Sequence, residues 1–303
     1  MALVSVVVPT RNRARYLAEA VESVLGQSHR DLECVVVDGG STDGTRHLLT
    51  AIDDPRLTVI RHDRPRGPGV ARNRGLEAAS GEYVVFLDDD DRLLEHAVET
   101  LVETMREQPR DCAGVYARER RMGERNGSDA RSGTCRTVDR YTDAEIRGPS
   151  CTLVRAEVCE AVGGFDESFR FQEDADFWIR LFDSRSMVEL DRTLFERRYH
   201  DGQIVRTPEL MLAGERQLLE RHGADFSARW RSARYMRIAH FNALLGHTAV
   251  ARRALRAALR ERPRRVQCIY YSLLLLFGSR SYLVGRDGAK SLRDAVSTLR
   301  SRT

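Results

Sequence analysis

The chain has 303 residues, a hydrophobic content of 42% and a formal net charge of +4. This length accommodates one large domain with an appendage, or two domains. The six cysteines lack paired CxxC spacing, which argues against a zinc site or a disulfide framework, and no segment reaches ~18 apolar residues, which excludes a transmembrane helix. The first apolar run ends at Pro9 and has no basic region before it, so we expect no signal peptide. We therefore expect a cytoplasmic protein whose cysteines are buried, reduced thiols.

The charge is distributed unevenly along the chain. Residues 203–303 contain 20 Lys and Arg against 7 Asp and Glu, whereas the first 202 residues contain 29 against 38. A basic carboxyl-terminal part indicates an anionic partner, such as nucleic acid, anionic lipid or a charged substrate. A well-solvated helical face is the alternative, and both interpretations stay open.

Apolar runs and helical periodicity alternate through the first hundred residues. The expected strands are 3–8, 32–37, 57–60 and 83–87, and the expected helices are 17–25, 70–79 and 93–106. Pro9 is expected to stop the first strand, and Ser41 or Thr42 to cap the helix after the second strand. Strands that alternate with helices over short connections predict a Rossmann-like, doubly wound, mostly parallel α/β sheet.

The pattern is less regular after Pro109. The expected strands are 113–121, 151–154 and 194–199, with a polar loop at 123–132 and helices ending at 162 and spanning 173–181. Everything after Thr207 is expected to be helical: 208–222, 227–245, 248–261, 264–278 and 288–301. We therefore predict an α/β domain at 1–205 and an all-helical region at 206–303, for acceptor, dimer or membrane-surface contacts.

Four acids, Asp88 to Asp91, directly follow the apolar strand 83–87. They are expected just past the carboxyl end of that strand, where open α/β sheets bind ligands. Four neighbouring carboxylates repel one another unless a cation lies among them, and oxygen ligands suit Mg²⁺ or Mn²⁺. A solvated acidic turn before the next helix is the alternative.

Polar side chains follow the other expected strands at the same edge. The loop Pro9–Arg13 ends the first strand and Asp38 ends the second, where nucleotide sites of α/β proteins place an acid. Arg72 and Arg74 begin the helix 70–79, where arginines and free backbone amides suit a diphosphate. A capping loop and surface ion pairs are the alternative readings, but together these groups predict a nucleotide-diphosphate site with a divalent ion.

At this point the chain resembles the family 2 glycosyltransferases, which have the GT-A fold and invert the anomeric centre. The resemblance covers about residues 3–205 and is specific because four stretches occur together in order. These stretches are 4–13 (VSVVVPTRNR), 36–45 (VVDGGSTDGT), 71–75 (ARNRG) and 86–91 (FLDDDD).

The resemblance implies roles for individual residues. The nucleotide site would comprise Pro9, Thr10, Asn12, Arg13, Asp38, Arg72, Asp88 and Asp89. Asp38 would bind the nucleobase, usually uracil, although Gly39 replaces the second acid common in the family and leaves the base open. Asp88 and Asp90 would hold Mn²⁺ or Mg²⁺, and His200 would reach the metal or the diphosphate from a loop.

An inverting transfer also needs a carboxylate that removes the proton of the acceptor hydroxyl. The stretch Gln172 to Trp178 is similar to the family's Glu-Asp motif, which makes Asp174 the expected base, with Glu173 and Asp176 as the next candidates. Acids at a helix start that only favour its dipole are the alternative. Trp178 and Trp230 are expected either to stack on sugars or to lie in the core.

The helical region lies outside the resemblance. The Gln-x-x-Arg-Trp motif of processive members is absent, because Phe226-Ser227-Ala228 precedes Arg229-Trp230. The apolar stretch 268–277 follows three arginines, and a membrane contact, a dimer helix and a core helix all stay open for it.

These observations predict metal-dependent transfer of one sugar from a nucleotide-diphosphate sugar, UDP-linked in the first instance, to an acceptor hydroxyl with inversion. The acceptor would be a glycan, a glycolipid or a small molecule in cell-surface polysaccharide or glycoconjugate synthesis, in the cytoplasm or at the inner face of the membrane. The alternatives are a sugar nucleotidyltransferase and a non-catalytic nucleotide-sugar-binding protein. No nucleic-acid partner is expected, because the aromatic residues of the basic part form no evident platform.

Overall fold

The computed structural model describes residues 2–122, 134–141, 150, 152–200, 207–263, 270, 271, 274, 278, 279 and 284. The chain divides into two compact units, Met1–Asp201 and Gly202–Thr303. The expected loop at 123–132, and the expected helices at 264–278 and 288–301, lie largely or wholly outside the described residues.

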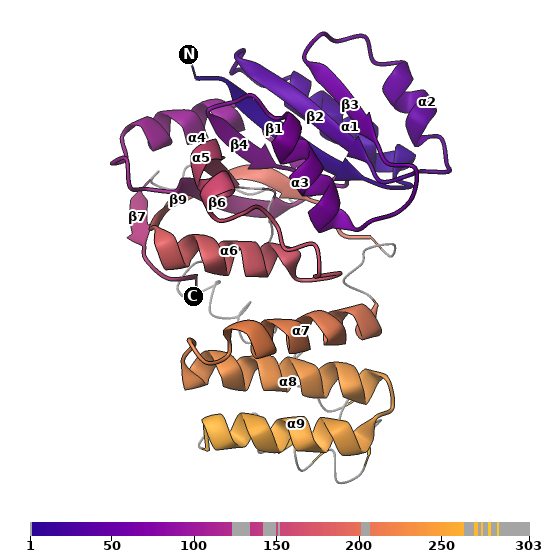
Figure 1. The fold of residues 1–303 in the computed structure, drawn as a ribbon, viewed down its shortest axis with the longest axis vertical. Helices are drawn as coiled ribbons and strands as arrows, with labels where there is room; N and C mark the ends of the chain where they lie inside the picture. The colour runs from indigo at the N-terminus through magenta and orange to yellow at the C-terminus, as the bar shows by residue number, and fades with distance from the viewer. Residues whose placement is uncertain are drawn as a thin grey trace, which may run out of the picture. The chain divides into compact units, whose positions relative to one another are not determined.

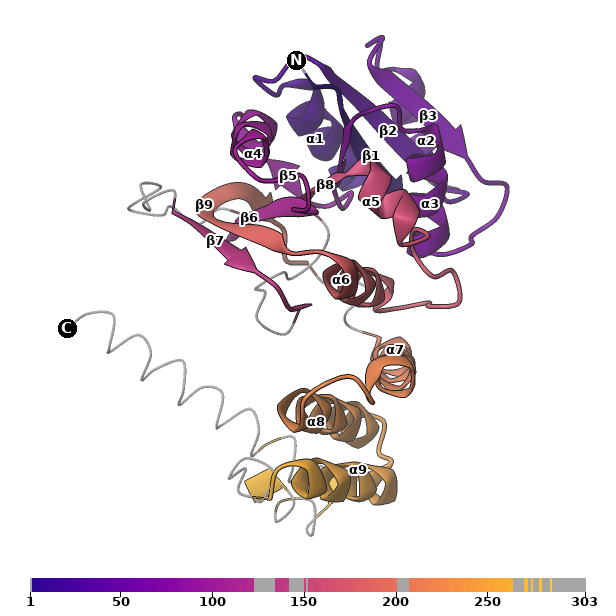
Figure 2. The same cartoon turned by 60° about the vertical axis from the view of Figure 1, so that its left-hand side comes forward.

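The first unit is built on one sheet with the strand order β3-β2-β1-β4-β8-β6-β9-β5, and β7 pairs with β9 (Figure 1; β5 and β8 are labelled in Figure 2). The strands are β1 Val4–Thr10, β2 Leu32–Asp38, β3 Leu57–Arg61, β4 Tyr83–Phe86, β5 Arg92–Leu93, β6 Gly114–Arg121, β7 Cys135–Val138, β8 Thr152–Arg155 and β9 Met187–Arg197. The pairs β3-β2, β2-β1 and β1-β4 are parallel. β8 runs antiparallel to both β4 and β6, and β6 is parallel to β9. The α/β prediction is confirmed, with a parallel half that carries the predicted motifs and a mixed half beside it.

Helices cover both faces of the sheet. The helices of this unit are α1 Ala14–Leu25, α2 Thr45–Thr50, α3 Pro68–Ala78, α4 Ala97–Arg106, α5 Ala156–Ala161 and α6 Glu173–Ser184. Val6 and Val8 of β1 lie in a core cluster with α1 and α4, whereas Val7 lies in a second cluster with α3, α5 and α6. Alternate residues of a strand point to opposite faces of the sheet. A strand covered by helices on both faces therefore needs apolar residues at every position, as β1 has from Val6 to Val8.

Pro9 does not stop the first strand, which corrects that prediction. β1 continues through Thr10, and Pro9 pairs with Val37 of β2. Val7 accepts a hydrogen bond from Leu87, while Thr10 accepts one from Gly39, so odd-numbered residues of β1 face β4. The β1-β4 pairing ends at Val7, so the missing N–H of Pro9 costs no ladder hydrogen bond.

Two further local predictions are wrong. Arg92 and Leu93 form β5 and pair with Glu196 and Phe195 of β9, so the helix expected at 93–106 begins at Ala97. Neither Ser41 nor Thr42 caps α2; instead the Asp43 carboxylate accepts a hydrogen bond from the Thr45 backbone at 3.0 Å. The first error arises because pairing with β9 overrides the helical propensity, and the second because Ser41 Oγ accepts from the Asn12 N–H instead.

The second unit contains α7 Pro208–His222, α8 Ala228–Leu244 and α9 Thr248–Glu261, close to the predicted ranges. Ala251, Ala254 and Ala258 of α9 are buried, and Ser232 of α8 donates to the Ala258 carbonyl at 3.0 Å. Within the described part of the chain, no helix combines the length and the apolar character that crossing a membrane requires.

The structure also tests the predictions about the tryptophan and cysteine side chains. Trp178 and Trp230 are buried, so both lie in the core. Cys34, Cys112 and Cys159 are buried, but Cys135 on β7 is exposed, so the expectation of buried thiols is wrong there.

Candidate active site

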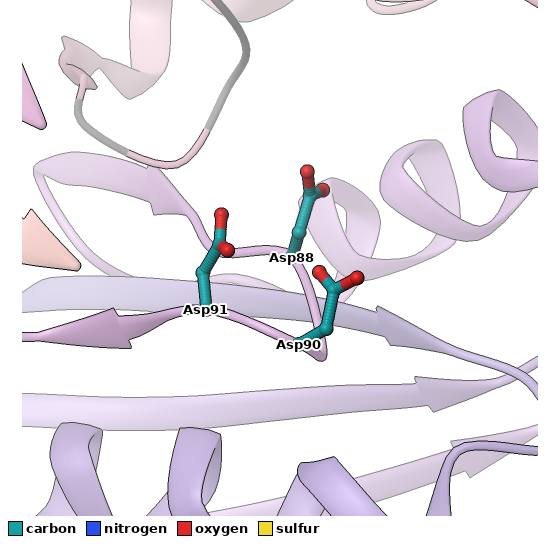
Figure 3. Close-up of side chains that lie close together, drawn as sticks. All are labelled: Asp88, Asp90 and Asp91. Atoms are coloured by element: carbon teal, nitrogen blue, oxygen red, sulfur yellow. The ribbon is translucent and has the colours of Figure 1, made fainter. Parts of the chain in front are cut away.

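Three carboxylates lie together in the loop between β4 and β5. Ligand atoms of Asp88, Asp90 and Asp91 lie within 4.8 Å of one another, and the side chains project to the same side of the loop (Figure 3). The Asp91 N–H donates to the Asp88 carbonyl at 3.1 Å, so a tight turn brings the first and last acid together. Three oxygen donors this close suit Mg²⁺ or Mn²⁺, which complete their shell with water and substrate phosphates.

Asp89 has a different position from its neighbours. Its Oδ2 accepts a hydrogen bond from Thr10 Oγ1 at 2.6 Å, which joins the loop after β4 to the end of β1. The predicted ligands Asp88 and Asp90 thus belong to the cluster, and Asp91, which the motif did not single out, completes it. The run of four acids was the available signal, but only the turn determines which of them converge.

The segment that follows β9 contacts this loop. His200 Nε2 lies 2.8 Å from Asp90 Oδ2, and the Arg198 N–H donates to Asp91 Oδ1 at 3.0 Å. The Arg198 guanidinium donates to the Asp90 carbonyl at 3.1 Å and to Glu19 at 2.7 Å. His200 therefore lies beside the acids, as expected, and Arg198 is a contact that the sequence did not reveal.

The electrostatics of the loop indicate a site that favours positive charge. Burial raises the pKa of Asp89 to about 7, although the hydrogen bond from Thr10 opposes the shift. Burial also raises the pKa of Asp91 well above its usual range, and the charges of Asp88 and Asp90 add to this effect. Carboxylates that resist ionisation together are stabilised when a cation binds among them.

Arg72 connects this loop to α6. Its side chain is 5% exposed, and its Nη2 lies 2.8 Å from Asp88 Oδ1 while its Nη1 lies 2.6 Å from Glu173 Oε1. The guanidinium also lies over the Phe165 ring, 5.4 Å from its centroid. Each terminal nitrogen donates one N–H to a carboxylate, which orients the guanidinium between the acidic loop and α6.

Asn73, the next residue of α3, holds the turn before α6. Its Nδ2 donates to the Phe165 carbonyl at 2.9 Å, and its Oδ1 accepts from the Phe165 N–H at 2.8 Å. The sequence assigned no role to Asn73, which binds a backbone segment 92 residues away. Arg72 and Asn73 together fix α3 against the elements that carry the candidate base.

The three acids at the start of α6 have different environments. Glu173 is 6% exposed and bound to Arg72, and Asp176 is fully buried with its Oδ2 2.8 Å from Arg180 Nε. Asp174 is partly exposed and accepts a hydrogen bond from the backbone of Ala175 at 2.8 Å. Its surroundings raise the pKa of Asp174 through burial, while the charge of Arg72 opposes the shift. Gln172, just before them, has a φ of 68°, a backbone conformation that costs energy for a residue of this type.

The ends of β1 and β2 are joined by hydrogen bonds. Asp38 is 2% exposed, and its Oδ1 accepts from the Ser41 N–H at 2.8 Å. The Asn12 N–H donates to Ser41 Oγ at 2.8 Å, and the Asn12 side chain accepts from the Thr42 N–H at 2.8 Å. Pro9 and Thr10 complete β1, and Arg13 Nη1 lies 3.5 Å from His200 Nε2. The residues predicted for the nucleotide, apart from Arg72 on α3, thus lie along the carboxyl ends of β1, β2 and β4.

The fold of this chain agrees with that of a solved protein structure. The chain aligns with the structure of S. aureus TarS 1-349 in complex with UDP-GlcNAc at a TM-score of 0.63 and 21% identity, covering 92% of this chain and 88% of that one. This similarity shows the fold, which is the GT-A fold of glycosyltransferases.

Sequence relatives identify the family. The model of glycosyl transferase family 2 matches residues 5–163. Glycosyltransferase GlyG of Streptococcus pneumoniae is 29% identical over 72% of this chain and 77% of its own length. Succinoglycan biosynthesis protein ExoO of Rhizobium meliloti is 33% identical over 71% of this chain, which spans 54% of that protein. The chain therefore belongs to glycosyl transferase family 2 and is a glycosyltransferase, as the resemblance predicted.

Proposed function

We propose that the chain transfers one sugar from a UDP-sugar to an acceptor hydroxyl with inversion, using Mg²⁺ or Mn²⁺ held by Asp88, Asp90 and Asp91. The convergence of these three carboxylates at the carboxyl end of β4 is the observation that carries the proposal. The chemistry of the donor set supports it, because oxygen ligands next to a diphosphate are the usual environment of these ions. When bound, the ion would neutralise the charge of the leaving diphosphate.

Asp174 is the proposed base. Glu173 and Asp176 are each buried and bound to an arginine, whereas Asp174 is partly exposed, as a carboxylate that must reach the acceptor hydroxyl requires. In the proposed step its carboxylate takes the proton of the acceptor hydroxyl as that oxygen bonds to the anomeric carbon. The bond between that carbon and the diphosphate breaks on the opposite face, which inverts the configuration.

The proposed donor site uses the ends of β1 and β2. Asp38, buried and oriented by the Ser41 N–H, would accept from the nucleobase, and Thr10, Asn12 and Arg13 would line the nucleotide. Arg72 would act on the diphosphate or through Asp88, and His200 would contact the metal or the diphosphate. The TarS complex with UDP-GlcNAc supports a UDP-linked donor.

The proposed acceptor is a hydroxyl of a glycan or glycolipid in cell-surface polysaccharide or glycoconjugate synthesis. The name of ExoO, a succinoglycan biosynthesis protein, supports this class of product. We assign the transfer to residues 1–205, and acceptor, dimer or inner-membrane contacts to the basic region 206–303.

The reaction type can be tested by its products. The enzyme is incubated with Mg²⁺ and a UDP-sugar, and released UDP is measured. In a second incubation it receives Mg²⁺, UTP and a sugar 1-phosphate, and released inorganic pyrophosphate is measured. Release of UDP with a product of inverted anomeric configuration, read from its proton coupling, supports the proposal. Release of pyrophosphate from UTP and the sugar 1-phosphate would instead indicate a nucleotidyltransferase, and a retained configuration in the first incubation would contradict the role of Asp174 as base.

A further inference from the structure

Tyr199 is an exposed aromatic residue on a backbone segment that is held on both sides. Its side chain is 52% exposed. The Arg198 N–H before it donates to Asp91 at 3.0 Å, and His200 after it lies 2.8 Å from Asp90. The ring is therefore fixed beside the acidic loop while half of it contacts no protein, and an exposed large aromatic surface at such a place is a candidate for ligand contact.

Arg121, the last residue of β6, lies against this ring. Its guanidinium carbon is 5.1 Å from the centroid of Tyr199. Other arginines of β6 and β9 bind carboxylates: Arg120 lies 3.0 Å from Glu196, and Arg197 lies 3.2 Å from Glu119. Across the described residues, by contrast, Arg121 is exposed and has no carboxylate partner. Its positive charge and its fork of N–H donors are therefore available to a ligand.

Arg197 connects the pair of Arg121 and Tyr199 to the proposed base. Arg121 is opposite Arg197 in the parallel pairing of β6 with β9. Burial opposes the charge of Arg197, but the charges of Glu119, Asp91 and Asp88 raise its pKa. Burial raises the pKa of Asp174, and the charges of Arg72 and Arg197 oppose that shift. Arg121 thus pairs with a residue of β9 that interacts electrostatically with the acidic loop and with Asp174.

We propose that Arg121 and Tyr199 form an acceptor subsite for a pyranose ring that carries an anionic group, either a carboxylate or a phosphate ester. The ring of Tyr199 offers an apolar surface to the C–H face of the sugar, and the planar guanidinium of Arg121 matches either anion in a bidentate contact. Because the guanidinium already lies against the ring, less conformational freedom is lost on binding. The acceptor role rests on the proposed transfer reaction, whereas the binding itself does not.

A matched set of small probes tests the subsite. Dissociation constants of methyl β-D-glucoside, methyl β-D-glucuronide and glucose 6-phosphate are measured by saturation-transfer NMR on the full chain, without metal so that no cation bridges the anion. The two methyl glycosides differ only at C6, which isolates the contribution of the anion. We expect at least one anionic probe to bind about tenfold more tightly than the glucoside. The anionic probe that binds more tightly shows whether the subsite prefers a carboxylate or a phosphate ester.

Variants assign this preference to the two residues. Arg121→Gln removes the preference for the anion and leaves glucoside binding, whereas Tyr199→Ala weakens all probes and Tyr199→Phe retains them. Arg30→Gln is the control, because Arg30 is exposed at the opposite, amino end of β2 and should leave every constant unchanged.

Equal binding of the three probes, no binding of any, or a preference that survives Arg121→Gln overturns the proposal. These outcomes are independent of UDP release, so they do not bear on the proposed transfer reaction. The retention of binding in Tyr199→Phe separates loss of the ring surface from loss of the fold.

Discussion

Arg72 Nη1 lies 2.6 Å from Glu173 Oε1, and the same guanidinium lies 2.8 Å from Asp88. One buried cation therefore joins the loop with the proposed metal ligands to the helix with the proposed base. Glu173 immediately precedes Asp174, so the distance between the two halves of the site depends on this side chain. Burial alone would lower the pKa of Arg72, but Asp88 and Glu173 raise it, so the group stays charged.

Removing this cation should destabilise the protein strongly. Arg72→Ala leaves two carboxylates near a dry environment without their partner, which typically costs about 3–5 kcal/mol. Arg74→Ala is the control, because the Arg74–Glu77 pair is exposed and such pairs contribute about 0–1 kcal/mol. Urea denaturation measures the unfolding free energy of both variants. Equal losses in the two variants would show that the Arg72 bridge has no special role in stability.

Substitutions of two acids in α6 should differ in their effects on the transfer rate and on the unfolding free energy. Asp174→Asn should reduce transfer by about 10²–10⁴-fold with little change in unfolding free energy, because the lost group accepts a proton. Asp176→Asn should mainly destabilise the fold, because it leaves Arg180 without its buried partner. Initial rates and denaturation curves of both variants decide this. Full activity of Asp174→Asn would assign the base to another residue.

The metal cluster predicts a contrast between neighbouring acids. Asp90→Asn and Asp91→Asn should each weaken Mn²⁺ binding by at least about tenfold, because each removes a converging oxygen. Asp89→Asn makes the same chemical change one residue away but should weaken binding far less, since Asp89 binds Thr10. Electron paramagnetic resonance of free Mn²⁺ gives these affinities. A loss for Asp89→Asn as large as the others would contradict the ligand set.

The raised pKa of Asp89 predicts how stability depends on pH. Its pKa is about 7 in the folded protein against an ordinary value of 3.8, so the folded state binds the proton more tightly than the unfolded state. The contribution of Asp89 is therefore greatest below pH ~4 and is lost as the pH rises toward 7, at up to about 1.4 kcal/mol per pH unit.

Denaturation at pH 5 and pH 7 without metal tests this dependence. The stability of the wild type relative to Asp89→Asn should fall between these two values. Added Mg²⁺ should reduce the fall, because a bound cation favours ionised carboxylates. A difference that is constant or rises with pH would contradict the expected sign.

Two adjacent glycines test the contact that Asn73 makes. Gly163 and Gly164 both have positive φ, but a Cβ on Gly163 meets nothing within 4 Å whereas one on Gly164 lies 2.6 Å from Asn73 Oδ1. Gly163→Ala should cost only the backbone strain, about 1–2 kcal/mol. Gly164→Ala should cost more, because Asn73 must move and lose its bonds to Phe165. Similar thermal shifts in the two variants would argue against this contact.

The strand ends of the parallel half were predictable from the sequence. Unbroken apolar runs fix β1, β2 and β4 as strands covered on both faces, and the polar residues after each strand must then meet at one edge. This reasoning brought Thr10, Asp38 and the acidic run together without any contact information.

The partners within the site were not predictable in this way. Arg72 was expected to face a diphosphate, but the two carboxylates that bind it are 16 and 101 residues away. The addition of Asp91 to the cluster depends on one turn, and β5 depends on its pairing with β9. The local sequence pattern carries no information about contacts between residues that are far apart in the chain. Tertiary packing alone decides these contacts.

The most direct test of the account is the release of nucleoside diphosphate from a panel of UDP-, GDP- and dTDP-linked sugars with Mg²⁺ or Mn²⁺. Slow hydrolysis of the donor requires no knowledge of the acceptor. The account predicts metal-dependent release from one donor, with UDP-sugars first, and loss of this activity in Asp90→Ala. If no donor is hydrolysed and no free nucleoside diphosphate binds in the presence of metal, the proposed transfer reaction is wrong.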